Sequence, residues 1–165
     1  MIPTPVTAGD VTLRAWEPEE ADLYASLRDD VVFRFTTESE SVGERECRQG
    51  IVEARGSRGQ VPFAVCDPGG RPVGNMALLR RGDTVEISYW LGEQARGRGW
   101  AAAALRAATE WAFRHWPVSQ AELEIDLANE PSMRVAEAAG YDRRGTRLTS
   151  ACGGPAAVFR RASLR

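Results

Sequence analysis

The chain has 165 residues, of which 43% are hydrophobic, so residues 1–165 are expected to form a single domain with a sizeable core. Its 21 basic and 23 acidic side chains leave a net charge of −2, which argues against a protein that mainly holds nucleic acid through its phosphates. No apolar run approaches the ~20 residues that a membrane-spanning helix requires. We therefore expect neither a nucleic-acid partner nor a membrane segment.

Hydrophobic periodicity, caps and turn residues predict the elements along the chain. In order, they are a strand at 11–16, a helix from 18 to about 31, an extended or irregular piece with Phe33 and Phe35, a helix from a Ser41–Glu44 capping box to about 55, strands at 61–66, 72–79 and 84–92, a helix from about 99 to 115, a strand at 120–127, a helix from 129 to about 139, and strands at 142–149 and 156–162.

The order of these elements predicts a mixed α/β (α+β) fold. Tight turns join most of the strands, which implies antiparallel pairing, while the strand–helix–strand unit at 84–127 implies one parallel pair. We expect a mostly antiparallel sheet of six to seven strands with helices on both faces.

The cysteines and the histidine argue against a metal site. Cys47, Cys66 and Cys152 lie far apart without a CxxC pair, and the single histidine, His115, cannot complete a zinc set at the usual spacings. His115 is instead expected to end a helix. Free thiols and the absence of a signal-like pattern at residues 1–5 predict a reducing, cytoplasmic location.

The most informative segment is the loop Leu91-Gly92-Glu93-Gln94-Ala95-Arg96-Gly97-Arg98-Gly99-Trp100-Ala101, between the strand at 84–92 and the long helix. Amides at a helix start lack internal partners, and glycines let the main chain approach a ligand closely. Together with two arginines, they favour phosphate or pyrophosphate. A flexible turn with a helix cap and solvated arginines is the alternative. The chain has no lysine for a Walker A loop, and Ala102 breaks a GxGxxG fingerprint.

Residues 94–99 of this loop resemble the Q/R-x-x-G-x-G/A signature of the GNAT superfamily of acyl-CoA N-acyltransferases. The preceding Glu86-Ile87-Ser88-Tyr89-Trp90-Leu91 is similar to the strand of the RimJ/RimL-type branch, which usually has glycine where this chain has Ser88. The expected element order agrees with that fold over nearly the whole chain. The resemblance implies that acetyl-CoA is the acyl donor and that the loop amides hold its pyrophosphate.

A second segment supports the resemblance. Asn129-Glu130-Pro131-Ser132, continuing to Gly140-Tyr141, is similar to the N-x-x-S segment of the same superfamily, in which the Asn contacts the pantetheine arm and the Ser lies near the sulfur of CoA. The alternative is that Asn129 is only a helix cap and Ser132 a first-turn residue. Some members carry a Tyr seven residues after the Asn; here that position is Ala136, so Ser132 is the candidate proton donor to the thiolate. Tyr141 is interpreted as a core aromatic.

The resemblance implies roles for further residues. The amide of Leu91 is assigned to the acyl carbonyl, and Glu86 to the base, acting directly or through water; a solvated carboxylate paired with an arginine is the alternative for Glu86. The residues expected to bind acetyl-CoA are Tyr89, Leu91, Gln94, Ala95, Arg96, Gly97, Arg98, Gly99, Trp100, Ala101, Asn129 and Ser132. Phe33, Phe35 and Trp90 are the candidates for binding the acceptor.

These assignments favour an N-acetyltransferase that acts on the α-amine of a protein or peptide. Acetylation of a small amine, such as an antibiotic, a polyamine or an amino acid, is the second possibility, and a non-catalytic acyl-CoA sensor is the third. A homodimer remains open. Exposed Trp16 or Trp116 would support one, although both are better interpreted as core residues.

Overall fold

The computed structural model describes residues 3–148 and 150–164. Within these ranges eight strands form one sheet, in the spatial order β1-β2-β3-β4-β5-β6-β8-β7. The strands are β1 (Val6–Ala8), β2 (Val11–Ala15), β3 (Gln60–Cys66), β4 (Pro72–Arg81), β5 (Thr84–Leu91), β6 (Gln120–Asp126), β7 (Asp142–Arg147) and β8 (Ala156–Ala162). The helices are α1 (Ala21–Leu27), α2 (Asp30–Phe35), α3 (Glu44–Gly56), α4 (Trp100–His115) and α5 (Glu130–Ala138), with 3₁₀ turns η1 (Pro18–Glu20) and η2 (Glu93–Ala95).

The mixed α/β architecture is confirmed, with one more strand than the upper limit expected. All pairs in the described sheet are antiparallel except β5–β6, which is the parallel pair predicted for the strand–helix–strand unit. None of the described helices is both long and apolar enough to cross a bilayer. Thr149, at the expected end of one strand, lies outside the described residues.

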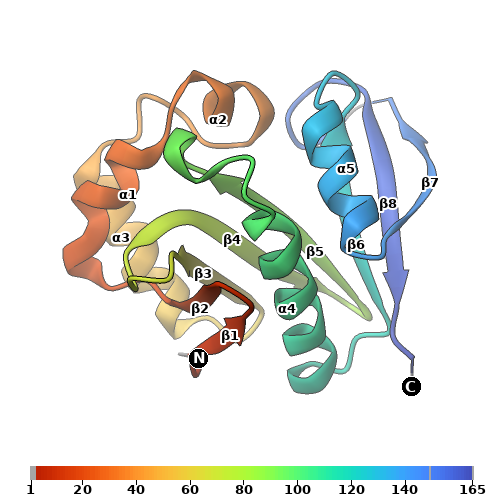
Figure 1. The fold of residues 1–165 in the computed structure, drawn as a ribbon, viewed down its shortest axis with the longest axis horizontal. Coiled ribbons are helices and arrows are strands. Elements are labelled where there is room, and N and C mark those ends of the chain that lie inside the picture. The colour runs from red at the N-terminus through yellow and green to blue at the C-terminus, as the bar shows by residue number, and fades with distance from the viewer. Residues whose placement is uncertain (1–2, 149, 165) are drawn as a thin grey trace.

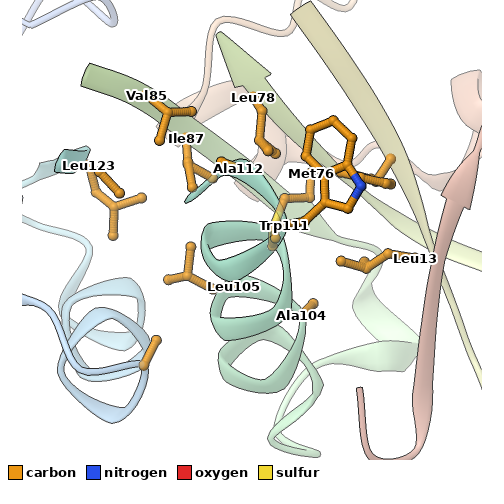
Figure 2. Close-up of a cluster of buried hydrophobic side chains, with 14 of the residues drawn as sticks. Leu13, Met76, Leu78, Val85, Ile87, Ala104, Leu105, Trp111, Ala112 and Leu123 are labelled. Carbon is orange, nitrogen blue, oxygen red and sulfur yellow. The ribbon is translucent and has the colours of Figure 1, made fainter. Parts of the chain in front are cut away.

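Helices cover both faces of the sheet (Figure 1). The face under α4 and α5 carries the larger core, because β2, β3 and β4 each direct alternate apolar side chains toward it. In Figure 2, Leu105 of α4 lies on the side of Ile87 and Leu123, whereas Leu13 of β2 lies on the other side of the helix, and all four belong to one core. The opposite face carries a smaller core under α1 and α3, centred on Trp16 and Ile51.

Four local details differ from the expectations. The segment with Phe33 and Phe35 is helical, because Asp29 caps α2 by accepting a hydrogen bond from the amide of Val32 at 3.1 Å. Gly43, not Ser41, caps α3. β1 escaped prediction because a three-residue strand shows almost no periodicity. The first helix also ends early, at Leu27, since the next residue is extended.

The central feature of the sheet is the divergence of β5 and β6. Their parallel pairing joins only Thr84–Glu86 to Gln120–Glu122, after which the strands separate (Figure 1). The two halves of the sheet therefore meet near one end and open toward the other, where β5 runs into the glycine-rich loop.

β4 and β5 are held closely together at this open end by Gly74, which pairs with Leu91. A Cβ atom on Gly74 would lie 2.3 Å from the carbonyl oxygen of Trp90, a contact that only a shift of backbone could relieve. We expect Gly74→Ala to lower the free energy of unfolding by about 1–3 kcal/mol in urea titrations.

The matched control is Gly50→Ala. Gly50 lies inside α3, where an added Cβ would meet nothing within 4 Å. This variant should gain roughly 0.5–1 kcal/mol, since alanine loses less backbone entropy than glycine in a helix. Equal destabilisation by the two substitutions would contradict the close approach at Gly74.

Candidate active site

The backbone of Leu91 faces the space between the diverging strands. The amide of Gly92 donates to the carbonyl of Val73 at 2.8 Å, just beyond the Gly74–Leu91 pair. Hydrogen-bonded and non-bonded pairs alternate in an antiparallel ladder, so the N–H and C=O of Leu91 point away from β4. Among the described residues no strand pairs with Leu91 on that side. Its N–H is therefore available to a ligand, whereas its side chain is buried in the core.

The glycine-rich loop continues directly from this position. Gly97 and Gly99 adopt left-handed φ values of 74° and 76°, which disfavour any residue with a Cβ, and nothing lies within 4 Å of the positions where one would be. Gly99 caps α4 without a side-chain hydrogen bond. The first-turn amides, including those of Trp100 and Ala101, have no intrahelical acceptors, as at any helix start, and such amides can bind an anion.

The two loop arginines do different things. Arg96 donates from Nε to the carbonyl of Leu91 at 3.0 Å and from Nη2 to Asp29 at 2.8 Å, so it fixes the loop to both β5 and the start of α2. Arg98 folds back onto the carbonyl of Gln94 and lies over the Trp100 ring. Gln94 itself is exposed, while Ala95 packs into the core.

Ser132 meets Tyr89 across the open space. The two hydroxyl groups share a hydrogen bond of 2.6 Å, although β5 and α5 are far apart in sequence. Asn129 accepts the amide of Ser132 at 3.2 Å and so is the cap of α5, as the simpler interpretation of this residue required. Burial raises the pKa of Tyr89 to about 12, more than the Ser132 contact lowers it, so this phenol stays protonated at neutral pH.

A cavity of about 750 Å³ adjoins this pair, on the face of the sheet opposite α4. Tyr89, Ser132 and Asn129 reach it from one end, and Trp90 and Phe35, two of the three predicted acceptor residues, form part of its wall. The third, Phe33, lies outside the lining and packs against the guanidinium of Arg28, 5.6 Å from the ring centre.

A network centred on Glu38 shapes the cavity wall. Its carboxylate accepts from Tyr24 at 2.5 Å, from the indole of Trp90 at 3.3 Å and from the buried Arg28 at 2.9 Å. It thereby fixes Trp90, next to Leu91, to the segment that follows α2.

Glu86 also lines the cavity, at the closed end of the divergence, 3.5 Å from Arg81. It is five residues from Leu91 on the same strand, a separation of about 16 Å at 3.3 Å per residue. A role in removing the amine proton would therefore require water or a substrate that spans this distance.

The fold and the loop point to one family, and a comparison of sequences decides it. The family model of the acetyltransferase (GNAT) domain matches residues 10–142. The chain belongs to the GNAT acetyltransferase family. It is an N-acetyltransferase of this family, and the matched residues include the loop at 94–99 beside the open end of β5. No curated protein sequence matches the chain.

Solved structures of GNAT proteins share the fold at low identity. Mycobacterium smegmatis RimJ in complex with CoA-disulfide has a TM-score of 0.84 at 18% identity, covering 98% of this chain and 87% of that one. Ribosomal-protein-S5-alanine acetyltransferase from Vibrio fischeri has a TM-score of 0.84 at 15% identity, covering 97% of both. AAC(6')-Ib in complex with paromomycin and acetyl-CoA has a TM-score of 0.76 at 18% identity, covering 93% of both. These likenesses show the GNAT fold.

Other residues of this GNAT domain are structural. His115 ends α4 and stacks on Trp111, with Nδ1 2.8 Å from that residue's carbonyl oxygen. Tyr141 is a core aromatic whose hydroxyl bonds Thr109. Trp16 and Trp116 are both buried, as their interpretation as core residues required. Within residues 3–148 and 150–164 no group of three or more His, Cys, Asp or Glu side chains could hold a metal ion.

Sequence reasoning missed the hydroxyl of Tyr89 as a partner of Ser132, and it gave Glu38 no specific contact. The period-2 pattern of β5 places Tyr89 on the face of Leu91, but it cannot show which helix lies opposite. Glu38 has no local sequence signal, because its three donors come from separate parts of the chain.

The Arg96–Asp29 contact predicts a pH dependence of stability. The hydrogen bond from Arg96 holds the pKa of Asp29 below its usual value. The contribution of Asp29 is thus present above the unfolded pKa of about 3.9 and is lost as the pH falls through the folded value. We expect Asp29→Asn, which can keep the cap on Val32, to lose stability relative to the wild type at pH 6 and to lose much less near pH 3. Urea unfolding at both pH values measures this; an equal difference at each would contradict the ion pair.

Proposed function

We propose that the protein transfers an acetyl group from acetyl-CoA to a primary amine, by direct attack of the amine in a ternary complex. The observation that carries the proposal is the unpaired amide of Leu91 in the divergence of β5 and β6, with the Tyr89–Ser132 hydrogen bond joining β5 to α5 beside it. A donor for a developing negative oxygen and a hydroxyl for a departing thiolate are what acyl transfer requires.

The loop fits the diphosphate of CoA. The glycine positions leave open space where side chains would otherwise lie, and the uncapped first turn of α4 offers several N–H donors. Residues 97–101 would hold the diphosphate through their main chain, with Arg98 exposed beside them. Arg96 would act indirectly, because its guanidinium already donates to the carbonyl of Leu91 and the carboxylate of Asp29.

The chemistry of the chain's own groups follows from their positions. The amide of Leu91 would hold the acyl oxygen and stabilise the charge that develops on it when nitrogen attacks. Ser132 would donate a proton to the thiolate as the C–S bond breaks, and Tyr89 could replace that proton through their shared hydrogen bond. The phenol stands in for the tyrosine that other members carry where this chain has Ala136.

For the acceptor we propose the α-amine of a protein or peptide. The ribosomal-protein acetyltransferases among the structural neighbours support this assignment. A small-molecule amine is the second candidate, supported by the cavity of about 750 Å³ beside Trp90 and by the aminoglycoside-bound neighbour. A homodimer remains a prediction. The free thiols Cys47, Cys66 and Cys152 agree with the reducing cytoplasm that we propose as its location.

The first test is release of free thiol from acetyl-CoA with a panel of N-terminal peptides and small amines. We expect release that depends on the acceptor. In Ser132→Ala it should fall at least ~10-fold, yet by less than the ~10⁴-fold upper range for general acid catalysis, because Tyr89 remains. Ser26→Ala, an exposed serine of α1, is the matched control and should match the wild type. Tight CoA binding with no release for any acceptor would instead favour a non-catalytic sensor.

A second test addresses the loop. Gly99→Ala forces a Cβ into a left-handed conformation, which costs ~1–2 kcal/mol. We expect the dissociation constant of CoA, measured by calorimetry, to rise about tenfold. Gly9→Ala introduces the same strain in the β1–β2 turn, where φ is 60°, and should leave CoA binding unchanged. Unaltered binding in Gly99→Ala would remove the loop from the CoA site.

A further inference from the structure

The carboxylates that line the cavity are not equivalent. They are Glu38, Glu46, Glu86, Glu122, Glu124 and Asp126. Each of the five glutamates has an arginine partner. Asp126 has no ion pair with any residue that the structure describes. It is therefore the lining carboxylate without an arginine partner, in a cavity that Tyr89 and Ser132 also line.

Asp126 also lies at the open end of the divergence. Continuing the Glu86–Glu122 register along both strands places Asp126 level with Trp90, next to Leu91. One carboxylate oxygen, Oδ1, accepts the amide of Ala128 at 2.8 Å, and this fixes the side chain. The main-chain carbonyl of Asp126 accepts the amide of Asn129 at 2.8 Å, so the same turn leads into Ser132.

The surroundings of Asp126 suit a proton acceptor. The other charged or titratable groups that line the cavity are Tyr24, Glu38, Glu46, Cys47, Arg81, Glu86, Tyr89, Glu122, Glu124, Arg147 and Cys152. Arg147 forms ion pairs with Glu122 and Glu124. The second oxygen, Oδ2, lies beside Gly154 and would be 3.6 Å from a Cβ atom added there. Asp126 is half-buried.

We propose that Asp126 is the general base of the transfer reaction, an inference that rests on the proposed function. Asp126 takes one proton from the acceptor ammonium, directly or through one water. The neutral nitrogen then forms the C–N bond at the acyl carbon while the C–S bond breaks. The thiolate receives a proton from Ser132, and the second amine proton is lost to solvent. The proton held by Asp126 then passes through water to restore the Ser132 hydroxyl. The reaction thus yields amide, thiol and one released proton.

The alternative base is Glu86, which is about 16 Å from Leu91 along β5 and has Arg81 beside it. Asp126 lies level with Trp90 along the strand direction, so no comparable length of strand separates it from Leu91. The two carboxylates can be separated by experiment, because a base matters only for an acceptor that begins protonated.

The decisive variant is Asp126→Asn, whose amide oxygen can still accept the Ala128 amide. Each enzyme is assayed from pH 6 to 9.5 with the best amine of the panel and with its aminooxy analogue, whose nitrogen is unprotonated throughout. We expect kcat for the amine to fall at least ~100-fold near neutral pH and to recover as the amine deprotonates. With the analogue, the variant should stay within about tenfold of the wild type, since the base contribution is no longer needed.

Controls separate this role from a structural one. Asp10→Asn makes the same change in an exposed turn and should leave both activities unchanged. Asp126→Ser, which keeps a hydroxyl for the Ala128 amide, should regain amine acetylation when formate is added. CoA binding by calorimetry shows that each variant is folded.

The outcomes are distinct. Equal losses of Asp126→Asn on the amine and its analogue would make Asp126 a binding or structural residue, and no loss would remove it from the reaction. If Glu86→Gln lost activity with the amine but not with its analogue, and Asp126→Asn lost activity with neither, Glu86 would be the general base. Absence of turnover in the wild type with every acceptor would instead overturn the proposed function itself.

Discussion

The end of the parallel ladder at Glu86 and Glu122 is the constraint on which the rest of the molecule depends. A sheet normally satisfies its backbone N–H and C=O groups through the neighbouring strand, and an unpaired group away from water is costly. Here the carbonyl of Leu91 is satisfied by Arg96, but the protein provides no strand partner for its N–H among the described residues. The open space is thus a place where a ligand's oxygen completes the hydrogen bonding.

The surrounding contacts keep this space open and rigid. On one side, Arg96 joins β5 to the cap of α2, and Glu38 joins Trp90 to the segment beyond α2. On the other side, the fork of Arg147 and the side chain of Arg160 hold Glu122, at the closed end of the gap. Guanidinium groups suit these positions because each can satisfy two acceptors in fixed geometry. These arginines therefore stabilise the contacts around the gap more than they supply positive charge to a ligand.

Much of the fold could be predicted because its signals are local. Strand alternation, the Asn129 cap and the glycine loop are read within a few residues, and the parallel pair follows from the handedness and length of a strand–helix–strand unit. The failures have equally local causes. The three residues of β1 are too few to show a period, and the cap of α2 depends on one aspartate whose side chain also serves Arg96.

The sequence by itself determined the loop at residues 94–99 and the capped start of α5, because main-chain geometry at glycines and caps follows from neighbouring residues. These two segments also indicated the family of the chain. Only the tertiary structure decided which side chains meet across the gap. Tyr89 and Ser132 are 43 positions apart, and Asp126 is distinguished only by the arginines that bind its neighbours and not itself. Such contacts depend on how two separated halves of a sheet diverge, and no pattern along one strand encodes that angle.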